Sequence, residues 1–525
     1  MGQPMGRRAA LTLPLAAGAS GLARRAHGQP VPGTAAQRTL RFVPYSNLIA
    51  TDPVWSISVI SLEHAFMTCD QLYGIDDRFV PRPQMAAGHE VSDDGLRWRF
   101  ALRDGLRFHD GEPVRAADCV ASIARWAKRD PFGQRMAALA DEMRVTGDRD
   151  FEIRLKRPFA QMLYGLGATT CFIRPERLAR TDAFQQITDQ TGSGPFRFLP
   201  DEFMSGSRVA YARHDGYVPR QEPPVMWSGG KMAYFDRVEW HILPDAATAA
   251  AALRTGEVDW VERPLLDLVP ALQKAPGVTV RNLHPLGLFS ILWLNTAAPP
   301  FDNPKLRHAL LPAVQQTDFM LAVVGDQPDL MRDGVGFFTP ASPFASAAGL
   351  DVLTGPRSLA TARRLVAESG YKGERVVLMV SDVPESIAMA QVAQALFKEL
   401  GLVVDYQTMD YGTLAARSRS TDPAVRAGWS CYCIAWAGLW PTNPGSNVPL
   451  AGYTPDPAMA ALRAQWFEAA DLPTQKAVAD RMQLRAVEQP PFIPLGQFFV
   501  PHAFRSKLSG FVPAPITAFW NVRAG

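Results

Sequence analysis

The sequence predicts a mixed α/β protein with more than one hydrophobic core, and two patterns lead to this prediction. Three Asp-Gly pairs between residues 94 and 111 are separated by alternating polar and apolar residues, which is typical of antiparallel strands joined by tight turns. From residue 236 onward the predicted strands and helices alternate, which indicates βαβ units and parallel sheet. A chain of 525 residues, 47% of them hydrophobic, is also too long for one ordinary core.

The antiparallel region begins with a strand over residues 38–45, which Asn47 and Asp52-Pro53 interrupt. Glycine after aspartate accepts the positive φ that a tight hairpin turn requires, so each Asp-Gly pair predicts a turn. A helix is predicted over residues 115–127. The three pairs are Asp94-Gly95, Asp104-Gly105 and Asp110-Gly111.

The later region contains two predicted βαβ units. In the first, Asp245 caps a helix that ends at Gly256, because aspartate is a favoured N-cap and glycine a favoured C-terminal residue. Pro312 lies inside a further helical pattern, which it should bend because proline removes an internal hydrogen bond. The predicted strands are 238–243, 258–261, 376–380 and 403–407, and the predicted helices are 246–253, 306–314, 359–367, 387–400 and 474–488.

Residues 1–28 read as an export signal. Arg7-Arg8 precede a mostly apolar run of about fifteen residues, and Ala26 and Gly28 have the spacing of a cleavage site. The paired arginines favour the twin-arginine route, with ordinary Sec export as the alternative. A membrane anchor is the other interpretation, but the run is shorter than the roughly 20 residues that span a bilayer. Residues 29–38 are the linker that follows.

The mature chain is expected to be a soluble periplasmic protein. No later stretch has the length and apolar character of a membrane span, and the first cysteine, Cys69, lies far from the cleavage point, so no lipid anchor is expected. Removing the four arginines of residues 1–28, which contain no acid, takes the formal charge from +3 to −1. Without a positive surplus there is no electrostatic case for binding nucleic acid.

A search for catalytic or metal-binding motifs predicts no enzyme and no metal or other cofactor. Residues 192–195 lack the context of a nucleophile elbow, and Gly229-Gly230-Lys231 lacks the first glycine of a phosphate loop. The nine histidines show no ligand pair at helical spacing. The five cysteines, at 69, 119, 171, 431 and 433, are interpreted as thiols, with Cys431 and Cys433 on one face of a strand.

The most distinctive segment of the chain is VSDDGLRWRFALRDGLRFHDGEPV at residues 91–114. It closely resembles the signature of the family 5 extracellular solute-binding proteins, the group of dipeptide, oligopeptide and nickel binders. Further matching segments follow in the family's order and span essentially the whole mature chain: GSGPFRF at 192–198, RHDGY at 213–217, LRTGEVD at 253–259, PFDNPKLRHAL at 300–310, ARRLVAESGY at 362–371 and FWNV at 519–522.

By this resemblance the fold is a two-lobed periplasmic-binding-protein clamshell, type II-like, with an additional third domain. Lobe I would comprise residues 39–58, 189–288 and 488–525, the additional domain residues 59–188, and lobe II residues 289–487. The chain would cross between its parts near residues 188, 289 and 487. The resemblance further implies a monomeric binding component of an ABC importer, which captures a peptide or similarly sized solute between the lobes and delivers it to the permease and ATPase subunits.

Two other functions remain open at this stage. An exported hydrolase or peptidase could use the same cleft, and it would turn its ligand over, whereas a binding protein returns it unchanged. A periplasmic sensor would hand its ligand to a receptor, and neighbouring genes for two permeases and two ATPases would favour transport instead.

The candidate ligand-binding residues are Trp436, Gly438, Leu439, Trp440, Tyr45 and Asn47. In the peptide binders that the chain resembles, a segment like Gly-Trp-x-x-Asp carries an aspartate for the peptide's α-amino group, and that position falls on Leu439. A buried ammonium without a carboxylate is costly, so we expect a solute other than a zwitterionic di- or tripeptide, such as an N-blocked peptide. Asp410 or Asp422 could supply the charge from elsewhere. Alternatively, both tryptophans are core residues.

Overall fold

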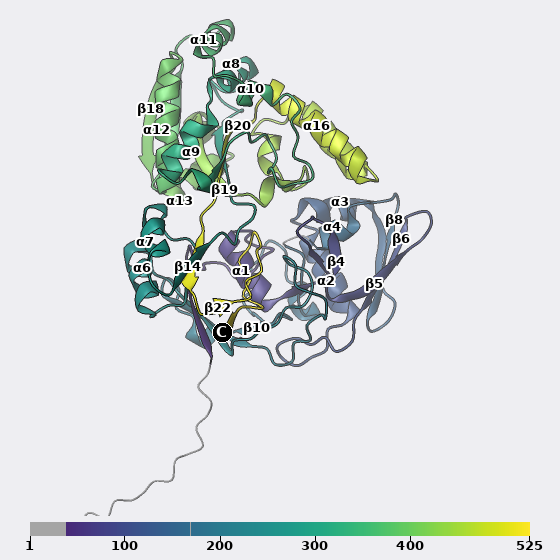
Figure 1. Ribbon diagram of the computed structural model, residues 1–525. Helices are drawn as coiled ribbons and strands as arrows, with labels where there is room; N and C mark the ends of the chain where they lie inside the picture. Colours follow the sequence, from purple (N-terminus) through teal and green to yellow (C-terminus); the bar gives the residue numbers. More distant parts are fainter. Residues whose placement is uncertain (1–37, 168–169) are drawn as a thin grey trace, which may run out of the picture. The chain divides into compact units, whose positions relative to one another are not determined.

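The computed structural model describes residues 38–167 and 170–525, and all structural statements below refer to these residues (Figure 1). The predicted export signal, residues 1–28, and all of the predicted linker except Arg38 lie outside them. Within the described part, no helix is long and apolar enough to cross a membrane.

A seven-stranded sheet contains the first strand of the chain. Strand β1 pairs in parallel with both β12 and β13, the two strands that α6 (Ala246–Thr255) connects, which confirms the first βαβ unit. Asp245 caps α6 by accepting a hydrogen bond from the Thr248 N–H at 2.6 Å, and Gly256 ends it with a φ of 83°. The order is β10 (Phe196–Phe198), β11 (Arg208–Arg213), β12 (Arg237–His241), β1 (Thr39–Val43), β13 (Trp260–Val261), β21 (His502–Arg505) and β14 (Val278–Arg281).

A six-stranded sheet contains the second predicted βαβ unit. Helix α12 (Pro384–Glu399) connects β17 to β18, which pair in parallel over their whole lengths, and it lies alongside them in Figure 1. Cys431 and Cys433 pack in the same core cluster, as the alternation of a strand predicts. The order is β16 (Met331–Arg332), β20 (Phe492–Phe498), β15 (Leu288–Leu294), β19 (Cys431–Ala437), β17 (Arg375–Ser381) and β18 (Val403–Met409).

The strand β20 lies in the six-stranded sheet, whereas our boundary at residue 488 assigned it to the first lobe. We predicted a crossing near residue 487, but every residue of β20 is buried and the strand pairs with β15 and β16. The chain therefore crosses between the two large sheets through residues 282–287 and 499–501.

The four-stranded sheet of the region 59–188 has the order β5 (Ala86–Val91), β6 (Arg97–Leu102), β8 (Asp150–Leu155) and β7 (Ala140–Val145), all antiparallel. The glycines of the three Asp-Gly pairs all have positive φ, as predicted. Helix α2 (Ala116–Trp126) follows them and packs against β7, β8 and the short α5 (Glu176–Ala179).

The remaining helices and strands connect or cover these sheets. Around Pro312, the predicted continuous helix is a short α8 (Pro304–Leu310) followed by a 3₁₀ turn (Leu311–Ala313), because proline interrupts the α-helical hydrogen bonds. The other helices are α1 (Val59–Thr68), α3 (Pro131–Leu139), α4 (Met162–Leu166), α7 (Val269–Gln273), α9 (Gln316–Val324), α10 (Asp351–Thr354), α11 (Leu359–Glu368), α13 (Tyr411–Arg419), α14 (Pro423–Ala427), α15 (Pro457–Glu468) and α16 (Leu472–Glu488). The short strands are β2 (Asp70–Gln71) with β9 (Phe172–Ile173), β3 (Tyr73–Ile75) with β4 (Pro81–Pro83), and β22 (Leu508–Ser509) with β23 (Arg523–Ala524).

Candidate functional site

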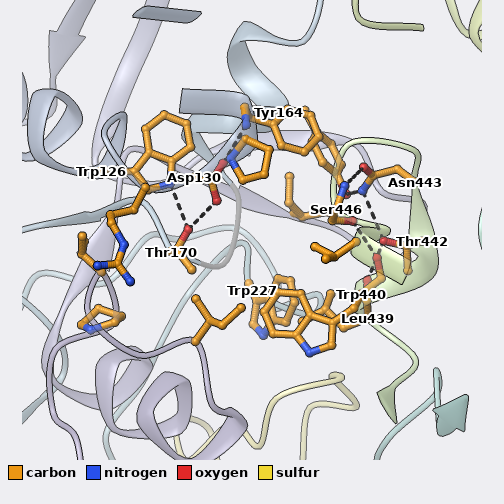
Figure 2. Close-up of a pocket in the computed structure, with 18 of the residues that line it drawn as sticks. Trp126, Asp130, Tyr164, Thr170, Trp227, Leu439, Trp440, Thr442, Asn443 and Ser446 are labelled. Carbon is orange, nitrogen blue, oxygen red and sulfur yellow. Dashed lines mark hydrogen bonds between the residues drawn. The ribbon is translucent and has the colours of Figure 1, made fainter. Parts of the chain in front are cut away.

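A cavity of about 220 Å³ lies where several segments that are distant in the sequence meet (Figure 2). Its walls are mainly apolar and aromatic, with a few polar side chains among them, which is the composition of a typical small-molecule site. The lining comes from residues 53–57, from the junction of α2 and α3, and from the loop after β19. It consists of Pro53, Val54, Trp55, Ile57, Ile75, Phe79, Trp126, Arg129, Asp130, Pro131, Phe132, Tyr164, Thr170, Met226, Trp227, Leu439, Trp440, Thr442, Asn443, Ser446 and Val448.

On one side of the cavity, a chain of hydrogen bonds ends on Asp130. The indole N–H of Trp126 donates to Thr170 Oγ1 at 2.9 Å, and the Thr170 hydroxyl donates to Asp130 Oδ2 at 2.8 Å (Figure 2). Asp130 is also the N-cap of α3, and its Oδ1 accepts from the backbone N–H groups of Phe132 at 2.8 Å and Gly133 at 3.4 Å. Burial raises the pKa of the Asp130 carboxyl, although the hydrogen bonds from Thr170, Phe132 and Gly133 oppose this.

On another side, the loop after β19 is held both by its own polar groups and by residues of other segments. Thr442 and Ser446 donate to the carbonyl oxygens of Leu439 and Trp440 at 2.7 and 2.8 Å. Asn443 donates to the Tyr164 hydroxyl at 3.1 Å, which joins the loop to α4 (Figure 2). Burial raises the pKa of Tyr164 to about 12, so the phenol stays neutral at physiological pH. These contacts fix the Leu439 and Trp440 side chains in the wall.

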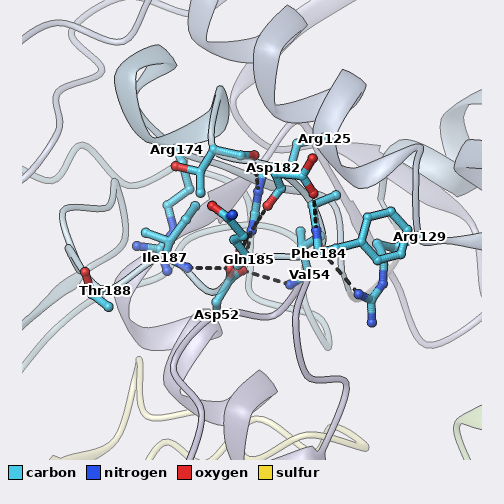
Figure 3. A network of polar contacts seen from close by, with 12 residues as sticks. Asp52, Val54, Arg125, Arg129, Arg174, Asp182, Phe184, Gln185, Ile187 and Thr188 are labelled. Carbon is cyan, nitrogen blue, oxygen red and sulfur yellow. Dashed lines mark hydrogen bonds and ion pairs between the residues drawn. The ribbon is translucent and has the colours of Figure 1, made fainter.

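A buried ion pair anchors the wall formed by residues 53–57. The Arg125 guanidinium donates to both oxygens of Asp52, at 3.0 and 2.6 Å, and also to the carbonyl oxygen of Gln185 at 2.8 Å (Figure 3). Asp52 in turn accepts from the backbone N–H groups of Val54 and Ile187. Burial alone would raise the pKa of Asp52, but Arg125 and the Ile187 N–H hold it below its usual value. The pair thus ties residues 53–57 to α2 and to residues 181–187.

The structure places two of the predicted ligand-binding residues, Leu439 and Trp440, in the wall of the cavity. Tyr45 packs in the same hydrophobic cluster as these two, with its hydroxyl accepting from the Ile60 N–H at 3.3 Å and the Arg263 guanidinium 4.0 Å from its ring centre. Gly438 lies directly before them, pressed against the backbone of Leu286.

The other two predicted residues lie away from this lining. Trp436 packs against Trp293, with ring centres 5.1 Å apart, and Asn47 bonds to Ser205 and to the Gly206 N–H. The carboxylates of Asp410 and Asp422, which we considered as alternative anchors, cap the helices α13 and α14 and are not among the lining residues.

The sequence analysis did not single out Trp55, Arg129, Asp130, Thr170 or Trp227. Asp130 precedes Pro131 in the pattern of a helix start, which is a structural signal, and nothing in it indicates a cavity wall. Lys231, which we examined as part of a phosphate loop, is fully buried and pairs with Asp70 at 2.7 Å. Among residues 38–167 and 170–525, no group of three or more His, Cys, Asp or Glu side chains could hold a metal ion.

Comparisons with known proteins agree with this architecture. The family model described as "Bacterial extracellular solute-binding proteins, family 5 Middle" matches residues 80–456. The "probable peptide ABC transporter periplasmic-binding protein y4tO" of Sinorhizobium fredii is 35% identical over 500 residues, covering 93% of this chain and 94% of the relative. The glutathione-binding protein GsiB of Salmonella typhi is 26% identical over 427 residues, which is 77% of each chain.

Solved structures share the fold at low sequence identity. The periplasmic binding protein DppA of Helicobacter pylori, in complex with the peptide STSA, matches with a TM-score of 0.76 at 19% identity and covers 93% of this chain and 98% of its own. AgaA of A. tumefaciens, in complex with agropinic acid, matches with a TM-score of 0.74 at 19% identity and covers 93% and 99%.

Proposed function

This chain belongs to family 5 of the bacterial extracellular solute-binding proteins, and we propose that it captures a peptide or similarly sized polar solute in the cavity described above. It is the substrate-binding component of an ABC importer and delivers its solute to the membrane permease. The proposed site is supported by the fact that the wall of the cavity is formed by segments from both large sheets. Residues 53–57 follow a strand of the seven-stranded sheet, whereas residues 439–448 follow a strand of the six-stranded sheet. A solute that contacts both walls links the two sheets.

The lining also supports binding rather than catalysis. The titratable side chains among the lining residues are those of Arg129, Asp130 and Tyr164. The lining residues include no histidine, cysteine or lysine. Tyr164 accepts a hydrogen bond from Asn443. The hydroxyl of Thr170 donates to Asp130, but this carboxylate also caps α3, which favours a structural role for the pair. We therefore propose that the protein has no enzymatic activity and returns its solute unchanged.

The same proposal covers the cellular context. Family 5 proteins are extracellular solute-binding proteins, and residues 1–28 would export this chain to the periplasm, by the twin-arginine route in preference to Sec. The mature protein would act there as a monomer without a lipid anchor, with the permease and ATPase subunits of its importer as partners. The seven-stranded and six-stranded sheets would be the cores of its two lobes, with residues 59–188 as the additional domain.

For the binding residues, we propose that Leu439 and Trp440 contact the solute directly, with Gly438 and Tyr45 shaping the wall behind them. We propose that Trp436 and Asn47, the other two candidates, make no direct contact with the solute, because they lie away from the lining. Because Leu439 offers no charge to an ammonium group, the solute would be something other than a zwitterionic di- or tripeptide.

The experiment is to purify the exported protein, identify co-purifying solutes by mass spectrometry, and titrate the solute found by calorimetry. We expect one solute per chain, recovered unchanged after hours of incubation. Trp440→Ala should weaken binding at least about tenfold, because it removes an aromatic wall. Trp436→Ala is the matched control, and it should change the affinity less than twofold. Turnover of the solute, or equal losses in the two variants, would contradict the proposed function or the proposed site, respectively.

A further inference from the structure

The cavity contains two charged side chains, Arg129 and Asp130, and only one of them has its charge balanced by neighbours. Asp130 accepts hydrogen bonds from two backbone N–H groups at the start of α3 and from the Thr170 hydroxyl. A carboxylate in this position is stabilised by the helix N-terminus as well as by its donors. These donors of the protein itself thus offset part of the cost of burying the Asp130 carboxylate.

Arg129 has no such balance. Its guanidinium donates one long hydrogen bond, 3.4 Å, to the Ala183 carbonyl oxygen, and no acidic side chain of the described residues lies within ion-pair distance of it. Instead it lies against two aromatic rings, with its central carbon 5.8 Å from the ring centre of Trp55 and 5.0 Å from that of Phe184. Aromatic faces attract a cation without neutralising it, so most of the guanidinium donors remain available.

The surroundings hold Arg129 in this place. Phe184 belongs to the segment that Arg125 binds through the carbonyl oxygens of Thr181 and Gln185, and Trp55 follows the Asp52 that pairs with Arg125 (Figure 3). Both rings that flank Arg129 are thus positioned by one buried ion pair. A preorganised guanidinium suits a planar anion, because its fork of N–H donors matches the two oxygens of a carboxylate.

The rest of the wall is apolar. Trp227 and Trp440 line the cavity together with Leu439, whose side chain carries no charge. This wall suits an uncharged hydrophobic or aromatic group.

We propose that the solute is an anion with an apolar body, whose carboxylate binds Arg129 and whose body packs against Trp227, Leu439 and Trp440. The inference rests on the proposed function, because it assigns a solute class to that same cavity. An N-acylated amino acid or peptide has this chemistry. The guanidinium, which has no ion pair among the described residues, supplies the charge complement for the carboxylate of such a solute.

A zwitterionic solute, with its ammonium on Asp130, is the alternative that the test must separate. Asp130 and Arg129 are neighbours in sequence, so a short zwitterion could reach both. Asp130 already accepts three hydrogen bonds, so an ammonium group would meet only the oxygen lone pairs that these donors leave free. Leu439 offers no charge to an ammonium group either, and both features favour an anionic solute.

The test uses three matched probes with the purified full chain: N-acetyl-alanyl-leucine, its C-terminal amide, and free alanyl-leucine, each titrated by calorimetry. We expect the acetylated acid to bind at least about tenfold more tightly than both others, since only it pairs one anion with an uncharged body. Arg129→Gln should remove this preference, weakening the acid to the level of the amide, and Arg129→Lys should retain part of it because the charge remains without the fork. Lys128→Gln removes the neighbouring exposed charge outside the lining and is the control, with the preference unchanged.

Two outcomes overturn the inference while leaving the proposed function intact. One is an amide that binds as tightly as the acid. The other is tight binding of free alanyl-leucine that is lost in Asp130→Asn, a substitution that keeps a good helix cap but removes the charge. If none of the three probes binds, both this inference and a peptide-sized solute in this cavity are contradicted. Unchanged affinity of the amide in Arg129→Gln shows that the variant is folded.

Discussion

Gly438 lies where the chain leaves β19 and passes very close to the segment before β15. A Cβ atom built on Gly438 would lie 1.8 Å from the Leu286 carbonyl oxygen, whereas real contacts of this kind need more than 3 Å. The Gly438 N–H also donates to the Gly287 carbonyl oxygen at 2.9 Å, and its own carbonyl accepts from Thr339 at 2.5 Å. The glycine thus holds the start of the loop that carries Leu439 and Trp440 against a segment connecting the two large sheets.

Gly438→Ala is expected to destabilise the protein by about 2 kcal/mol or more, because the methyl group must push backbone rather than a flexible side chain. Chemical unfolding measures the change as a lower denaturant midpoint at unchanged slope. Gly88→Ala is the matched control, since a Cβ there meets nothing within 4 Å, and it should cost less than about 0.5 kcal/mol. Equal midpoints for the two variants would show that the close approach at Gly438 relaxes at little cost.

The resemblance to the peptide binders led us to predict Leu439 and Trp440 as ligand-binding residues, and both line the cavity. The resemblance could not predict the role that we propose for Arg129, because that role depends on which side chains surround the guanidinium in the folded protein. An arginine next to Asp130 in the sequence suggests a local ion pair, yet Asp130 caps α3, and within the described part of the chain no acidic side chain pairs with Arg129. Only the folded arrangement shows that this cation is unpaired.

At the scale of elements, local signals predicted the helices and strands well. Asp245, Gly256 and Pro312 act through their own backbone chemistry, so their effects on α6 and α8 could be predicted from sequence. The sheet to which β20 belongs could not, because an apolar segment of seven residues fits the middle of either sheet. Its partners β15 and β16 lie some 200 and 160 residues earlier in the chain, beyond any local pattern.

One buried histidine, His284, lies in the connecting segment 282–287, and another, His502, begins β21 directly after the segment 499–501. His284 and His502 meet edge to face with ring centres 4.5 Å apart. His284 Nε2 lies 3.2 Å from Thr517 Oγ1 and 3.9 Å from Glu262, while Trp260 donates to His502 Nδ1 at 2.9 Å. Burial, with Arg263 nearby, lowers the pKa of His284 to about 4, although Glu262 opposes this, and burial also lowers the pKa of His502.

A lowered histidine pKa means that the unfolded chain binds more protons than the folded chain between pH 6.5 and 4. Stability from His284 is therefore fully present above pH 6.5 and is lost as the pH falls toward 4, by roughly 2 kcal/mol between pH 7 and 5. His284→Gln should reduce the acid destabilisation by about this amount, measured as the difference in unfolding free energy between pH 7 and pH 5.

The variant must be compared with the parent protein because the carboxyl of Glu63 changes the pH dependence of stability in the opposite direction. Burial and the nearby Glu262 raise the pKa of Glu63 well above its usual value, so its contribution is present at low pH and is lost as the pH rises. The two effects overlap in the parent protein, but only the histidine effect is absent from His284→Gln. If the variant and the parent lose the same stability between pH 7 and 5, His284 is protonated in the folded state and the expectation is wrong.

At the scale of the whole molecule, the cavity and the two connecting segments determine how solute binding and conformation are coupled. Residues 53–57 continue from the seven-stranded sheet and residues 439–448 from the six-stranded sheet, and the chain passes between these sheets at 282–287 and 499–501. Gly287 has a φ of 49°, and a Cβ there would lie 2.6 Å from the Phe498 carbonyl oxygen, so the two connecting segments are tightly packed. Any relative motion of the sheets must be absorbed by changes in these short segments.

We therefore expect the solute to draw the two lobes together about residues 282–287 and 499–501, because only the arrangement with both walls on the solute gains the full binding energy. Small-angle scattering should show a smaller radius of gyration at saturating solute than without it. The decrease in the radius of gyration should require solute contacts with both walls. Trp440→Ala, saturated with the same solute, should therefore show a smaller population of the compact state. Trp436→Ala is the control and should behave like the parent protein. An unaltered radius of gyration at full occupancy, established by calorimetry on the same sample, would mean that the solute enters without closure, and the coupling of the two lobes through the cavity would then be wrong.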